Sequence, residues 1–60
     1  MARSKAAQEA YDRTTTFGIE NGGDLLNAER KIEKGEPLNK AEEDAMITYG
    51  QLLIAELEAE

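Results

Sequence analysis

The sequence predicts an all-α fold, a small protein in which two helices form a hairpin and a shorter N-terminal helix accompanies them. Apolar residues recur at the three- and four-residue spacing of a helix side, and no alternating strand pattern flanks the turn residues. Glycine-marked breaks at residues 18–24 and 35–39 divide the 60 residues into three segments. We therefore expect three helices in a single domain, residues 1–60, whose second and third helices form the hairpin.

The first helix is expected over residues 4–16. Ser4 is a suitable N-cap, and residues 5–10 are good helix formers. The β-branched residues 14–16 lower helix propensity, and Gly18 suits the left-handed position that follows many helices. The helix should therefore end close to this glycine.

The second helix is expected over residues 25–34. Asn21-Gly22-Gly23 is the strongest turn signal in the chain, so residues 18–24 should form a loop. Asp24 can then cap the helix that follows it. Gly35 is expected to end this helix in a left-handed conformation directly after Lys34.

The third helix is expected over residues 40–59, a length of about 30 Å at 1.5 Å per residue. Asn39 and Glu42 have the spacing of a capping box, in which each side chain bonds the other residue's backbone N–H. The apolar residues of this helix cover about 220° of its circumference, against about 100° for an ordinary surface helix. They are Ala45, Met46, Tyr49, Leu52, Leu53 and Leu57, with Ile47 and Ile54 beside them.

The composition argues against an enzyme and against a metal or cofactor site. The chain has no His and no Cys, which removes the usual general bases, zinc ligands and disulfides. Successive carboxylates at residues 42–44 point in different directions on a helix, and we interpret them as solvated residues that stabilise its first turn. The loop at residues 18–24 lacks the Lys-Ser/Thr of a phosphate-binding loop and carries two acidic residues.

The net charge of −6, from 13 acidic and 7 basic residues, argues against direct nucleic-acid binding. No apolar segment approaches the roughly 20 residues that span a bilayer, and the first seven residues do not resemble a secretory signal. These features predict a protein that is cytoplasmic or associated with a virus particle and does not bind membranes.

The broad apolar arc of the third helix predicts the function. Helices one and two offer few large apolar residues to cover it, and a core of this size rarely supplies more than about 3–5 kcal/mol. We expect a structural or interaction protein, oligomeric or bound in a complex, that docks on copies of itself or on a larger assembly such as a virus particle. The predicted contact residues are Met46, Tyr49, Leu52, Leu53, Ile54 and Leu57.

The sequence leaves open a second function for the chain and two explanations of Gly50. An acidic inhibitor that imitates DNA would instead use the carboxylates at both ends of the third helix against a nucleic-acid-binding protein of a host. These are Glu42, Glu43, Asp44, Glu56, Glu58 and Glu60. Gly50, inside the third helix, costs about 1 kcal/mol relative to Ala. It either permits the close approach of another helix or is a tolerated imperfection.

Overall fold

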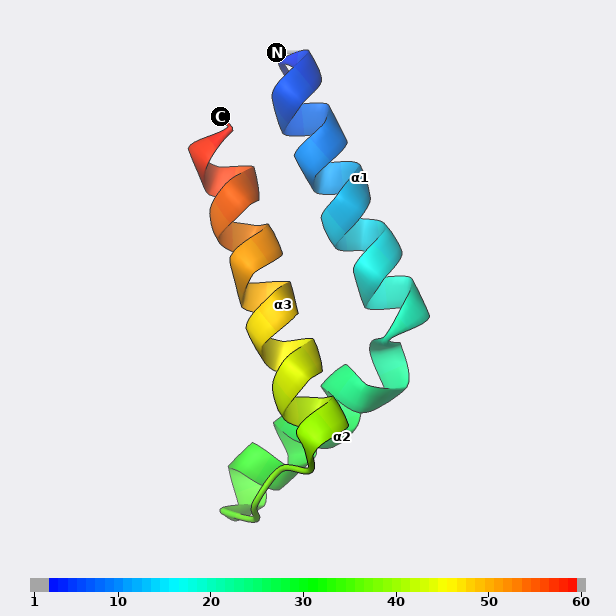
Figure 1. Cartoon of the computed structure of the whole chain (residues 1–60), viewed down its shortest axis with the longest axis vertical. Helices are drawn as coiled ribbons and strands as arrows, with labels where there is room; N and C mark the ends of the chain where they lie inside the picture. The colour runs from blue at the N-terminus through cyan, green and yellow to red at the C-terminus, as the bar shows by residue number, and fades with distance from the viewer. Residues whose placement is uncertain (1–2, 60) are drawn as a thin grey trace.

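The computed structural model describes residues 3–59, so Glu60 lies outside the described residues. These residues form three helices, α1 (Lys5–Glu20), α2 (Gly22–Lys34) and α3 (Lys40–Glu58). In Figure 1, α1 and α3 lie side by side and run in opposite directions, whereas α2 crosses the end of the molecule opposite the two termini. The Cα atoms extend over 41 × 18 × 18 Å, and the all-α prediction is confirmed. The expectation of a shorter N-terminal helix is wrong with respect to α2, because α1 has 16 residues and α2 has 13.

The beginning of α1 follows the local sequence, but its end does not. Ser4 caps the helix, because its Oγ accepts a hydrogen bond from the backbone N–H of Ala7 at 3.1 Å. The predicted end near Gly18 is wrong, since α1 continues through Gly18 to Glu20.

Contacts with α3 explain why α1 continues. The buried hydroxyl of Thr14 lies 3.0 Å from the Ala10 carbonyl oxygen and 3.4 Å from that of Leu52 in α3. The Phe17 ring stacks on Tyr49 with centroids 6.4 Å apart, and a Cβ on Gly18 would lie 3.8 Å from Tyr49 Cε1. Packing on a neighbouring helix thus overrides the weak local propensity of residues 14–18.

The predicted loop at residues 18–24 is reduced to Asn21, the single residue between α1 and α2. Asn21 ends α1 by donating its backbone N–H and its side-chain amide to the Phe17 carbonyl, at 2.9 and 3.1 Å. The α2 helix begins at Gly22, so the prediction that Asp24 would cap it is wrong. Asp24 lies in the first turn, where the positive end of the helix dipole stabilises a carboxylate.

The junction between α2 and α3 confirms both local predictions. Gly35 has φ 73° and ψ 22°, and the next N–H, that of Glu36, bonds the Lys31 carbonyl at 2.8 Å. Asn39 Oδ1 accepts the Glu42 N–H at 2.8 Å, and Glu42 Oε1 accepts the Asn39 N–H at 2.9 Å. This capping box begins α3 where the sequence places it.

Substitutions at this junction should destabilise the fold. Gly35→Val forces a β-branched residue to positive φ and should lower the free energy of unfolding by about 1 kcal/mol or more. Asn39→Ala removes the cap and should lower it by about 0.5–2 kcal/mol. Urea unfolding measures both effects. Gly23→Val is the control, because Gly23 lies in a helix with open space around it and should tolerate the same change; equal stability of all three variants would contradict the prediction.

Alanine forms most of the interior. Ala7, Ala10, Ala28 and Ala45 are buried, together with Thr14 and Glu42, and no large side chain among residues 3–59 is fully buried. Small side chains let helices approach closely, which is how the Thr14 hydroxyl reaches a carbonyl of α3. Most of the large aliphatic side chains consequently remain outside.

Candidate functional site

The exposed side of α3 carries a stripe of apolar residues. We call it the α3 face and define it by Met46, Ile47, Gly50, Leu53, Ile54 and Leu57. Each of these residues has another member seven positions away, so they stack on one side of the helix within an arc of about 120°. Ile47, Leu53, Ile54 and Leu57 are 59, 39, 56 and 69% exposed. The described helices cover this surface only in part.

The structure divides the six predicted contact residues into two groups. Leu53, Ile54 and Leu57 lie on the α3 face, and half-buried Met46 lies at its edge. Tyr49 and Leu52 are instead half-buried on the side of α3 that faces α1, where Tyr49 stacks on Phe17. Ile47 was not among the predicted contact residues, although its seven-residue spacing from Ile54 signalled that both lie on the same side.

Gly50 lies in the middle of the α3 face. A Cβ placed on it would meet no side chain or neighbouring helix within 4 Å, so packing within the described fold does not require a glycine at this position. The close approach of another helix remains a prediction, and it applies to the exposed side of α3.

A groove between α2 and α3 adjoins this face at Met46. Its lining residues are Leu25, Glu29, Ile32, Glu33, Met46 and Tyr49. Its volume of ≈ 240 Å³ is below the roughly 300–1,000 Å³ of small-molecule sites. The groove is therefore suited to a single inserted side chain.

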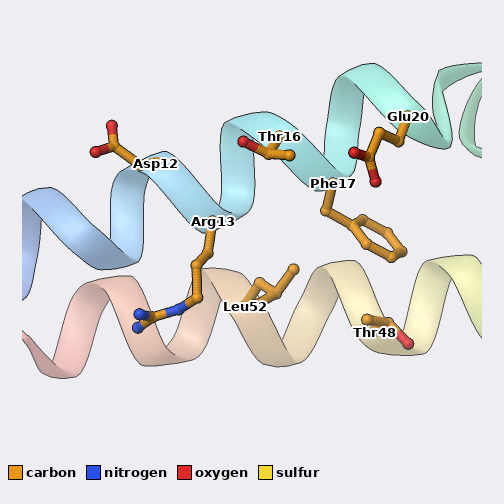
Figure 2. A pocket seen from close by; sticks show the side chains of 7 residues that line it. All are labelled: Asp12, Arg13, Thr16, Phe17, Glu20, Thr48 and Leu52. Atoms are coloured by element: carbon orange, nitrogen blue, oxygen red, sulfur yellow. The ribbon is translucent and has the colours of Figure 1, made fainter.

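A wider groove of ≈ 470 Å³ runs between α1 and α3 and is drawn in Figure 2. Phe17 projects from α1 and Leu52 from α3 into the space between the helices, and Arg13 reaches across toward α3. Charged Asp12 and Glu20 and two threonines complete the lining. A threonine hydroxyl needs a neighbouring base to become a nucleophile, whereas Asp12 Oδ1 accepts a hydrogen bond from Gln8 Nε2, at 2.9 Å.

The carboxylates at residues 42–44 do not act together. Within residues 3–59, no three acidic side chains come close enough to share a metal ion, and no helix has the length and apolar content to cross a membrane. Glu43 and Asp44 are exposed, as expected, whereas Glu42 is buried. The interpretation of this cluster as wholly solvated is therefore wrong for Glu42.

Glu42 connects α2 to α3. Its Oε1 accepts a hydrogen bond from Lys31 Nζ at 2.6 Å as well as the Asn39 N–H, and its side chain is 3% exposed. The bond from Lys31 and the Asn39 N–H lower the pKa of the Glu42 carboxyl below its usual value, although burial opposes them. The capping pattern was visible in the sequence, but the pairing with Lys31 depends on how α2 crosses α3.

The lowered pKa of Glu42 predicts a specific response to acid. The stabilisation that ionised Glu42 provides should be fully present above the pKa of this carboxyl in the unfolded chain, about 4.5. It should be lost as the pH falls through the lower pKa of the folded chain. Glu42→Gln should therefore be less stable than the parent at pH 7, and the difference should shrink in acid. Urea unfolding over a pH series measures this, with exposed Glu43→Gln as the control. A difference that stays constant across the series would contradict it.

No protein family, curated protein or solved structure matches this chain. The functional proposal therefore depends on the chain's own surface.

Proposed function

We propose that this protein is a non-enzymatic structural or interaction protein that docks through the α3 face, on further copies of itself or on a larger assembly such as a virus particle. The observation that supports the proposal is that small apolar side chains fill the interior while large ones lie on the surface. Alanines occupy the interior, while Ile47, Ile54 and Leu57 are more than half exposed on one side of α3. Contiguous exposed apolar surface of this kind marks interaction sites in soluble proteins.

Burial of the α3 face supplies the driving force for docking. A Leu or Ile side chain gains about 1.5–3 kcal/mol when it moves from full exposure to full burial. Leu53, Ile54 and Leu57 are partly covered already, so each gains a fraction of that amount on docking. The chain's own helices do not bury the exposed parts of these side chains. A partner surface would bury them and supply this free energy.

The experiment that tests the proposal measures association of the chain at low and high salt. Sedimentation equilibrium detects self-association, and affinity capture from the natural host with mass spectrometry identifies a larger partner. Association through the α3 face should persist at high salt, because burial of apolar surface is not screened by ions. Complete dissociation of the complex at high salt would contradict the proposal and favour an acidic inhibitor that imitates DNA.

A further inference from the structure

The groove between α2 and α3 combines apolar residues with two carboxylates. Leu25 and Ile32 of α2 and Met46 and Tyr49 of α3 provide its apolar lining. Glu29 and Glu33 line the same groove one helical turn apart, and both are exposed. Like charges at this spacing repel each other and destabilise a helix.

The chain's own cations do not neutralise these carboxylates. Among residues 3–59, the only ion pair with a nitrogen–oxygen distance within 4.0 Å joins Lys31 to Glu42, at the junction of α2 and α3. Glu29 and Glu33 thus present two negative charges beside an apolar hollow that is large enough for one side chain. Charge complementarity predicts a cation next to whatever apolar group enters the groove.

We propose, as a refinement of the docking function above, that the α2–α3 groove binds a basic amphipathic helix of another protein. One large apolar side chain of that helix enters between Ile32 and Met46, and an adjacent Lys or Arg reaches Glu29 and Glu33. Because the groove meets the α3 face at Met46, the next apolar residues of the same helix, at three- and four-residue spacing, lie on Leu53 and Leu57.

Charge distinguishes this occupant from a second copy of the chain. Each copy carries a net charge of −6, and α3 itself contributes Glu43, Glu56 and Glu58 near the apolar surface. A second copy that docks through its own α3 would place acidic residues against Glu29 and Glu33, which is unfavourable. A basic helix covers the same apolar residues and relieves the repulsion between the two carboxylates.

The test uses two designed peptides of about 18 residues, long enough to form a helix. Both carry Leu at helical spacing; one has Lys at the remaining positions and the other has Glu. Binding of each peptide to the full chain is measured by fluorescence anisotropy at several salt concentrations. The variants are Glu29→Gln with Glu33→Gln in the groove, and Glu9→Gln with Asp12→Asn as a control pair one turn apart on α1.

The Leu/Lys peptide should bind and the Leu/Glu peptide should not. Two partly screened ion pairs predict that the groove variant binds about three- to tenfold more weakly, with a smaller salt dependence, while the control pair binds like the parent. Equal losses in both variants would indicate general attraction to an acidic protein and would overturn the proposal. Self-association that the Leu/Lys peptide does not displace would also overturn it, in favour of a second copy.

The Leu53→Asp variant separates failure of this inference from failure of the docking function. If both peptides bind the parent equally well and Leu53→Asp abolishes their binding, the α3 face docks but the basic partner is wrong. If Leu53→Asp binds the Leu/Lys peptide as tightly as the parent does, the docking function itself fails, and the inference fails with it.

Discussion

The Leu53→Asp variant is expected to lose association while it keeps its helices. Leu53 is 39% exposed on the α3 face, so an Asp at this position stays hydrated in the isolated chain. In a docked complex the same carboxylate would be buried without a partner, which is strongly unfavourable. Together with the lost Leu burial, up to about 1.5–3 kcal/mol, this predicts at least a tenfold weaker association. Sedimentation equilibrium or affinity capture measures the loss, and circular dichroism checks the helices.

A charge variant provides the matched comparison. Glu56, Glu58 and Glu60 changed together to Gln shift the net charge from −6 to −3 and leave the α3 face intact. Docking through apolar surface predicts little change in association for this variant. The reverse pattern, in which the Gln variant loses binding and Leu53→Asp retains it, would contradict the docking proposal and favour the acidic inhibitor.

Ala28→Leu is expected to have the largest effect on stability. Ala28 is 0% exposed in α2, so a larger side chain at this position would have to displace the residues packed against it. Added volume in such an interior costs about 1–3 kcal/mol, against the roughly 3–5 kcal/mol that a core of this size supplies. A large part of the stability should therefore be lost, and the thermal midpoint should fall steeply.

Ala6→Leu is the control for this substitution. Ala6 is exposed on α1, so the added side chain extends into solvent and should leave the thermal midpoint nearly unchanged. Thermal melts of the two variants and the parent make the comparison. If Ala28→Leu melts like Ala6→Leu, the interior has room for a larger side chain, and the close packing described above is wrong.

Half of the helix boundaries could be predicted because their hydrogen bonds are local. Ser4 begins α1 through Ala7, and Asn39 begins α3 through Glu42, each three residues ahead. Gly35 ends α2 because a residue without Cβ readily adopts positive φ. The breadth of the apolar arc on α3 was equally readable, since it follows from the sequence and the helical period alone.

The sequence by itself therefore determined three helices, the capped starts of α1 and α3, the glycine at the end of α2, and a third helix more apolar than its neighbours could cover. Only the tertiary structure decided that α1 continues past Gly18, because the contacts of Thr14 and Phe17 are with α3, far along the chain. It also decided which part of the arc stays open. Packing against α1 covers Tyr49 and Leu52 and leaves Ile47 exposed, since the angle at which two helices meet is a property of both surfaces.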